Sequence, residues 1–163
     1  MALGHLSVGD ETCRENILDY FYSLSTFFKQ PEIHFNVGEA ICACAFGFAS
    51  TQMSEYIDIP TFNFPRNDLV PKGFDNIFDK VLPESSLISK KAGSIWLLCL
   101  VKYCGKTEYV LNTLLRIHHS FSSLLGSNDD FIQEIASKGL GMIYEIGDER
   151  IKGELLASLV FRS

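Results

Sequence analysis

The chain has 163 residues, 47% of them hydrophobic, and a formal net charge of −6. This length suits one domain or a few repeats of an array, and thirteen Phe with six Tyr exclude a disordered polar chain. Its scattered Lys and Arg argue against nucleic-acid binding, which requires a clustered basic surface.

No membrane or export signal is predicted. The longest apolar runs, residues 40–49 and 92–101, are each ten residues long, about half of what a bilayer requires. The first five residues do not form the charged and then apolar start of a secretory signal. Five cysteines without framework spacing indicate reduced thiols, so we expect a cytoplasmic and nuclear protein.

Helical periodicity begins at residue 11 and runs through most of the chain. The first predicted helix covers residues 11–28, and its apolar residues recur at spacings of three and four. Those on its expected buried side are Cys13, Ile17, Leu18, Phe21, Leu24 and Phe28. Pro31 ends this helix and begins the next, predicted over 32–49, because proline is tolerated in a first helical turn.

Residues 50–73 interrupt the helical rhythm. Prolines at 60, 65 and 71 and a glycine at 73 forbid a continuous helix, and ordered loops longer than about 12–15 residues are often functional. Five large apolar residues make this insertion the candidate partner-binding segment: Tyr56, Ile57, Ile59, Phe62 and Phe64. The alternative is that they cover the chain's own surface, because large exposed apolar patches are rare.

Further helices are predicted over 74–82, 86–104, 107–125, 128–146 and 148–161. Their expected caps are Ser85 or Ser86 and Asn128, with Asp129 and Asp130 favoured by the positive helix end. The expected apolar face of the helix over 107–125 contains Val110, Leu111, Leu114, Leu115, His118, Phe121 and Leu125. The last helix is expected to bury Ile151, Leu155 and Leu159, and its lack of a following partner suggests a longer array.

A nine-residue pattern recurs at 33–41, 88–96 and 132–140: isoleucine, a small pair, then a large apolar residue. The last two copies are 44 residues apart (132 − 88), within the roughly 40–47-residue period of HEAT and armadillo arrays. The first gap of 55 (88 − 33) reflects the insertion. We therefore predict one all-α domain over 1–163, an α-solenoid of HEAT-like antiparallel helix pairs.

The predicted solenoid contains about three pairs, 11–49, 74–104 and 107–146, with an unpaired last helix at 148–161. Glycine costs about 0.5–1 kcal/mol in a helix relative to alanine, so the glycines within the pattern indicate close packing between helices. They are Gly38, Gly93 and Gly139. The alternative is three ordinary amphipathic helices in a bundle without repeats.

No catalytic, cofactor-binding or metal-binding residue is predicted, and the chain is not expected to be an enzyme. Gly105-Lys106-Thr107 lacks the upstream glycine and strand of a phosphate-binding loop. Cys42 and Cys44 point about 200° apart on a helix and cannot alone hold a tetrahedral metal. His118 falls on an apolar face, where a hydrogen-bonded core histidine is typical. A small helical enzyme using His118 and a cysteine is the remaining alternative.

Three blocks resemble a known family: residues 37–41, residues 92–98, and Ala136-Ser137-Lys138-Gly139-Leu140 extended to Tyr144–Asp148. They are similar to the HEAT-repeat proteasome adaptor and scaffold protein family over about residues 11–160. Family members are many times longer, so the chain is expected to match an internal segment. Another HEAT-array scaffold, such as a transport receptor or translation-regulatory protein, is the alternative.

The resemblance implies an adaptor without catalytic residues or cofactors that binds the 26S proteasome and links its regulatory and core particles. It implies roles in proteasome assembly quality control and in ubiquitin-dependent or ER-associated degradation. It further implies protein partners alone, with association to ER or endosomes through those partners.

Overall fold

The structure is a computed structural model that describes residues 11–46 and 69–160. Every regular element in these two ranges is helical, and the helices stack on one another, which confirms the all-α solenoid prediction. In chain order they are α2 (Glu11–Ser23), the 3₁₀ turn η2 (Leu24–Thr26), α3 (Pro31–Phe46), α5 (Val70–Asn76), the π-helical turn η3 (Ile77–Val81), α6 (Leu87–Cys104), α7 (Glu108–Leu124), α8 (Asp130–Ile146) and α9 (Glu149–Val160).

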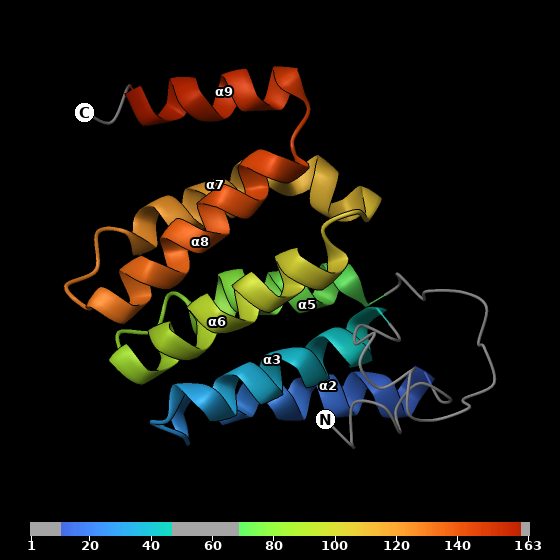
Figure 1. Ribbon diagram of the computed structural model, residues 1–163. Coiled ribbons are helices and arrows are strands. Elements are labelled where there is room, and N and C mark those ends of the chain that lie inside the picture. The colour runs from blue at the N-terminus through green and yellow to red at the C-terminus, as the bar shows by residue number, and fades with distance from the viewer. Residues whose placement is uncertain (1–10, 47–68, 161–163) are drawn as a thin grey trace.

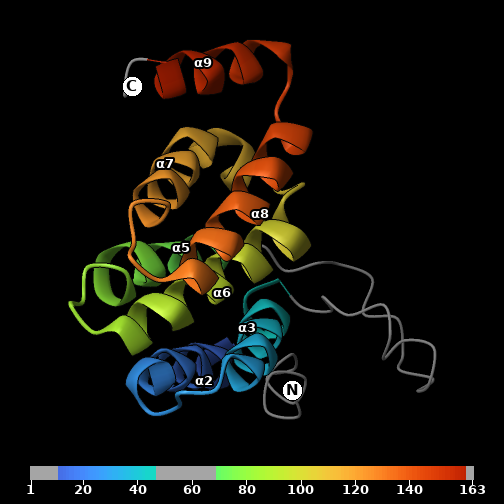
Figure 2. The same cartoon turned by 60° about the vertical axis from the view of Figure 1, so that its left-hand side comes forward.

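The helices form pairs that stack in chain order, α2 with α3, α5 and η3 with α6, and α7 with α8 (Figure 1). Figure 2 shows that the first helices of the pairs lie along one side of the stack and the second helices along the other. We call the first set row A (α2, α5 with η3, α7) and the second set row B (α3, α6, α8). Within row B, α6 packs on both α3 and α8, and α9 contacts α7 at the end of the stack.

Side chains at the starts of α7, α8 and α9 accept hydrogen bonds from backbone N–H groups that have no acceptor within the helix. The Thr107 hydroxyl accepts from the Val110 N–H at 3.4 Å and donates to the Cys104 carbonyl at 2.7 Å. Asp129 accepts from the Ile132 N–H at 3.2 Å, so the cap of α8 is Asp129 and not Asn128. Asp148 does the same for Ile151 at 2.8 Å. These bonds account for the polar residues at the helix starts without catalysis.

The helix expected to begin at residue 74 begins at Val70 in the structure. Pro71 lies in its first turn, where a missing N–H breaks no helical hydrogen bond. Gly73 is buried, and its carbonyl accepts a 2.7 Å hydrogen bond from the Tyr22 hydroxyl on α2. Two of the residues that suggested a loop over 50–73, Pro71 and Gly73, therefore lie within helix α5. Residues 47–68 lie outside the described ranges.

Two helices bury much of the expected side, including Leu18 and Phe21 on α2 and Leu114 and Phe121 on α7, but differ from it at other positions. On α2 and η2 the buried residues are Arg14, Leu18, Phe21, Tyr22 and Ser25, whereas Cys13 is exposed. On α7, Ile117 and Leu124 are buried, while Leu111, Leu115 and Leu125 are exposed. Both helices carry more apolar surface than their neighbours cover, so apolar periodicity alone located the buried face only approximately.

The three glycines of the recurring pattern are points of close approach between helices. A β-carbon at Gly38 would lie 2.7 Å from Cys99 Sγ on α6, which belongs to the next pair. One at Gly93 would lie 2.8 Å from Leu82 Cδ2, and one at Gly139 would overlap the Phe121 ring; both neighbours belong to the same pair. The pattern therefore marks tight packing within pairs as well as between them.

Substitution of the two glycines on α8 is expected to give opposite effects. Gly139→Ala should lower the free energy of unfolding by about 1–3 kcal/mol, because its β-carbon would overlap the Phe121 ring. Gly141 is exposed with open space around its β-carbon position, so Gly141→Ala should raise stability by about 0.5–1 kcal/mol. Urea unfolding followed by circular dichroism measures both, and changes of equal sign would contradict this packing.

Candidate partner-binding surface

The segment predicted to bind a partner lies outside the described residues. Tyr56, Ile57, Ile59, Phe62 and Phe64 all fall within residues 47–68. Their role in binding stays a prediction. The described helices nevertheless present other features that bear on function, in both row A and row B.

The residues weighed for catalysis are placed in the packed interior. His118 is buried on α7, and Cys42, Cys44, Cys99 and Cys104 are buried between α3 and α6. Burial raises the pKa of the Cys99 thiol to about 12 and that of Cys42 well above its usual range. Because the thiolate is the reactive form, these two thiols are poor nucleophiles at neutral pH. Within residues 11–46 and 69–160 no group of three or more His, Cys, Asp or Glu is arranged to hold a metal.

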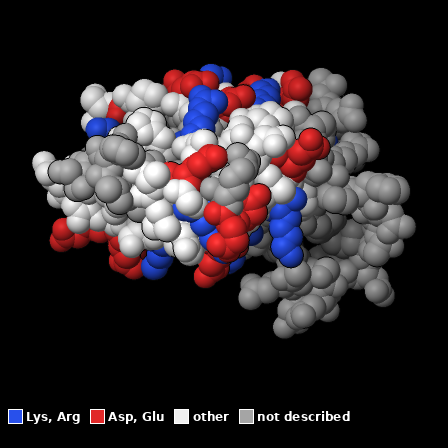
Figure 3. All heavy atoms as spheres, turned by 90° about the horizontal axis from the view of Figure 1, so that it is seen from above, with Lys and Arg blue, Asp and Glu red and all other residues white. Residues whose placement is uncertain are grey.

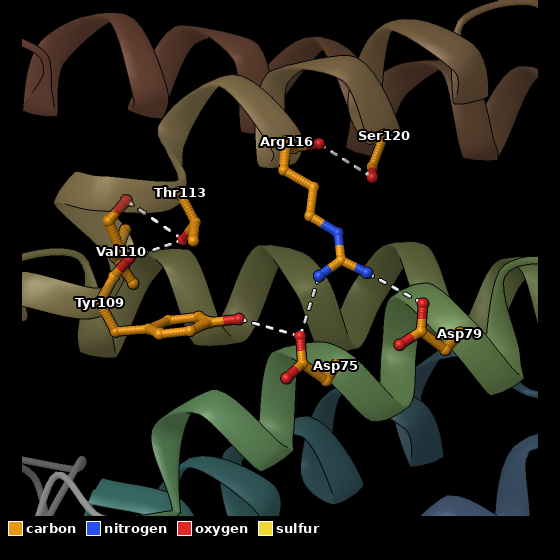
Figure 4. A network of polar contacts seen from close by, with 7 residues as sticks. All are labelled: Asp75, Asp79, Tyr109, Val110, Thr113, Arg116 and Ser120. Atoms are coloured by element: carbon orange, nitrogen blue, oxygen red, sulfur yellow. Dashed lines mark hydrogen bonds and ion pairs between the residues drawn. The ribbon is translucent and has the colours of Figure 1, made fainter.

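A polar network joins the second and third pairs across row A (Figure 4). Asp75 and Asp79 lie one helical turn apart, and Arg116 on α7 reaches both, with Nη1 to Asp75 Oδ1 and Nη2 to Asp79 Oδ1 each at 2.9 Å. The guanidinium also lies 4.4 Å from the ring centroid of Phe78. The Tyr109 hydroxyl donates to Asp75 Oδ1 at 3.0 Å. Burial and this hydrogen bond raise the pKa of Tyr109 to about 12.

Replacing Arg116 with alanine should destabilise the chain by about 1–2 kcal/mol. Exposed ion pairs contribute about 0.2–1 kcal/mol each, and a cation over an aromatic ring contributes a similar amount. Arg116→Lys is the matched control, since it keeps the charge but cannot bridge both carboxylates. Urea unfolding in 0.05 M and 1 M NaCl should show that the loss from Arg116→Ala shrinks at high salt; a salt-independent loss would contradict an ionic link.

Row B is joined through Trp96 and Lys91. Trp96 Nε1 donates to the His34 carbonyl at 3.1 Å, which links α6 to α3. Lys91 Nζ lies 2.7 Å from Asp129 Oδ2, which links α6 to the start of α8. Burial alone would raise the pKa of Asp129, but the hydrogen bonds from Lys91 and from the Ile132 N–H lower it on balance. The three pairs are therefore held in register along both rows.

Two hollows lie between neighbouring pairs. The row A hollow, about 360 Å³, lies between η3 and the end of α7. Its lining includes Phe78, Lys90, His119, Ser120 and Ser123. The second hollow, about 370 Å³, lies at the carboxyl ends of α3, α6 and α8. It is lined by Phe46, Val101, Lys102, Tyr103, Gly105, Lys106, Met142, Glu145 and Ile146.

The end of the stack at α9 has a mixed surface. Seen from above, acidic and basic side chains alternate among uncharged ones, without a broad area of one sign (Figure 3). Ile151 packs partly buried against the core, whereas Leu156 is exposed, and the side chains of Leu155 and Leu159 lie outside those described. In the described part of the chain, no helix is both long and apolar enough to cross a membrane.

These features define an all-α solenoid segment, with helix pairs joined into one body that offers hollows between repeats. No family model matches the chain, and no solved structure matches it. The chain is, however, 36% identical over 97% of its length to the proteasome adapter and scaffold protein ECM29 of Homo sapiens. It is 30% identical over 97% of its length to the proteasome-associated protein ECM29 homolog of Drosophila melanogaster.

The proteasome component ECM29 of Saccharomyces cerevisiae is 34% identical over 81% of the chain. These matches confirm the resemblance to the proteasome adaptor family: the chain is related to a segment of the ECM29 proteins. The chain spans about 9%, 8% and 7% of the lengths of these three relatives.

Proposed function

We propose that this chain acts as an adaptor and scaffold segment that associates with the proteasome and carries out no catalysis of its own. One observation carries the proposal: nearly the whole chain is similar to a segment of proteins named as proteasome adapters or components. The architecture supports it, because stacked helix pairs create extended surfaces that suit protein binding.

We further propose that the chain contributes to linking the regulatory and core particles of the 26S proteasome. Proteasome assembly quality control and ubiquitin-dependent or ER-associated degradation are the processes in which we place it. Protein partners without nucleic acid, in the cytoplasm and nucleus, fit this role. The support is again the family resemblance, together with a surface of interspersed charges at the α9 end (Figure 3).

A retention assay tests the proposal. The chain, tagged and immobilised, is incubated separately with intact 26S proteasomes, isolated core particles and isolated regulatory particles, under conditions that keep the 26S particle assembled. We expect retention of the 26S particle, and a linking role requires retention of each isolated particle. A scrambled chain of the same composition is the control for non-specific capture.

Failure to retain intact 26S proteasomes above that control would overturn the proposal. Stable binding to ribosomes or to a transport GTPase, with none to proteasomes, would favour another scaffold of the same architecture. Retention of one isolated particle alone would support adaptor function but contradict the linking role.

A further inference from the structure

We infer that the hollow at the carboxyl ends of α3, α6 and α8 binds an apolar side chain of a partner polypeptide that carries acidic residues beside it. The inference rests on the proposed role as a binding segment and specifies the chemistry that one of its surfaces recognises. We call this hollow the row B pocket.

The floor of the row B pocket is apolar and already formed. Val101 is buried there, and Met142 and Ile146 from α8 are half-buried. A β-carbon at Gly105 would lie 2.7 Å from Ile146 Cδ1, so the ends of α6 and α8 approach each other closely at the pocket, which both residues line. The volume of about 370 Å³ lies at the lower end of the range for binding pockets. It therefore suits a large apolar side chain rather than a flat surface contact.

One wall of the pocket is held in place by a bond between pairs. The Tyr103 hydroxyl donates to Glu39 Oε1 on α3 at 3.1 Å. Burial, followed by the charge of Glu39, raises the pKa of Tyr103 to about 12, so the phenol stays neutral and keeps this bond at physiological pH. The aromatic wall is thus positioned before a partner arrives, which lowers the entropy cost of binding.

The rim of the pocket is basic on a chain that is acidic overall. Lys102 lies in the last turn of α6 and Lys106 just beyond its end, and both are exposed. Neither forms an ion pair with a residue in the described ranges, although Lys72, Lys91, Lys138 and Lys152 all do. Lys102 is favoured by the negative end of α6, and its Nζ lies 5.0 Å from the ring centroid of Tyr103 in the pocket wall, whereas Lys106 lies outside the helix.

The charge balance selects an acidic partner. Among the residues that line the pocket, Lys102 and Lys106 are positive and Glu145 on α8 is negative, while Glu39, which accepts the Tyr103 hydrogen bond, is not part of the lining. Carboxylates next to the apolar anchor would meet both lysines, and such complementary charges set specificity and the rate of association. A basic partner would instead place its charge beside two lysines and be repelled.

The three methionines of the chain provide a local probe, because Met142 lines the pocket and the others are Met1 and Met53. The chain is labelled with ¹³C at the methionine methyl groups and titrated with a nine-residue peptide that has a central leucine between two glutamates on each side. We expect the Met142 signal to shift in a saturable manner. Peptides with serine for leucine, or with lysines for glutamates, should bind at least about tenfold more weakly.

Two double variants with equal changes in net charge test the rim. Lys102→Glu with Lys106→Glu should weaken peptide binding at least about tenfold. Lys29→Glu with Lys80→Glu is the matched control, because both lysines are exposed, line neither hollow and form no ion pair with a residue in the described part of the chain. It should change binding by less than about twofold. Circular dichroism checks that both variants keep the helical fold.

Several results would overturn the inference. They are equal binding of the serine or lysine peptide, an unmoved Met142 signal, and equal effects of the two double variants. A Met142 signal that responds to protein concentration would assign the pocket to a second copy, and one that responds to Tyr56→Ser would assign it to the chain's own residues 47–68. Because no proteasome is present in this titration, its outcome is separate from that of the retention assay.

Discussion

Trp96→Ala is expected to lower the free energy of unfolding by about 3–5 kcal/mol, the range for removing a large aromatic side chain from a packed core. Trp96 is fully buried. Its ring lies 5.7 Å, centroid to centroid, from Tyr22 on α2 and from His34 on α3, in edge-on geometry with both. Its Nε1 donates to the His34 carbonyl at 3.1 Å. The substitution would remove contacts between the first two pairs and leave that carbonyl without this donor.

Urea unfolding followed by circular dichroism measures this loss, since Trp96 is the one tryptophan and its removal abolishes that fluorescence signal. Trp96→Phe should lower the free energy of unfolding by less than Trp96→Ala does, because phenylalanine keeps most of the apolar volume and loses only the hydrogen bond and part of the ring. Phe27→Ala is the exposed control at 73% exposure and should change stability by less than about 0.5 kcal/mol. Similar losses for Trp96→Ala and Phe27→Ala would contradict the central position of Trp96.

Arg14→Met is expected to lower the free energy of unfolding by about 2–4 kcal/mol. The Arg14 side chain is fully buried, and its Nε and Nη2 donate to the Cys44 carbonyl at 3.0 and 2.8 Å. This carbonyl belongs to the last turn of α3, whose carbonyl groups have no partner within the helix. A hydrogen bond from a charged group contributes about 1.5–3 kcal/mol, and an acceptor left buried without a donor costs more. Methionine keeps much of the volume, so the loss would report the polar contacts.

Arg14→Lys separates charge from geometry. Lysine keeps the positive charge near the end of α3 but cannot donate from two nitrogens in a fixed plane, so an intermediate loss is expected. Lys29→Met removes an exposed charge and serves as the control. If thermal unfolding shows Arg14→Met to be as stable as Lys29→Met, the contact between α2 and the end of α3 contributes little to the fold.

Arg14 also shows where sequence reasoning ends. Apolar periodicity predicted the helix over 11–28, but it gave the buried side to Cys13 and left out Arg14, because charged residues are rarely buried without partners. The partner carbonyl is 30 residues away, and no local pattern indicates it. Asp75, Asp79 and Arg116 present the same difficulty, since their ion pairs join residues that are 41 and 37 apart.

Helix number, order and pairing were easier to predict because they depend on local signals. Spacings of three and four, Pro31 at a helix start and Gly105 before Thr107 act within a few residues. The start of α5 was harder, since Pro71 and Gly73 suppress helix locally, and the Tyr22 hydroxyl that bonds to the Gly73 carbonyl lies 51 residues away in the chain. For binding, the sequence indicated the aromatic residues of the insertion, whereas the row B pocket combines three helices that are separated in the chain.

The central place of α6 has a consequence for how the chain unfolds. This helix packs against row B neighbours on both sides and against row A, and one buried cluster includes residues from all three pairs. An array in which each unit stabilises its neighbours loses order from its ends inward. Amide hydrogens of α6 should therefore exchange with solvent most slowly and those of α9 fastest, with opening of α6 requiring the loss of nearly the whole array.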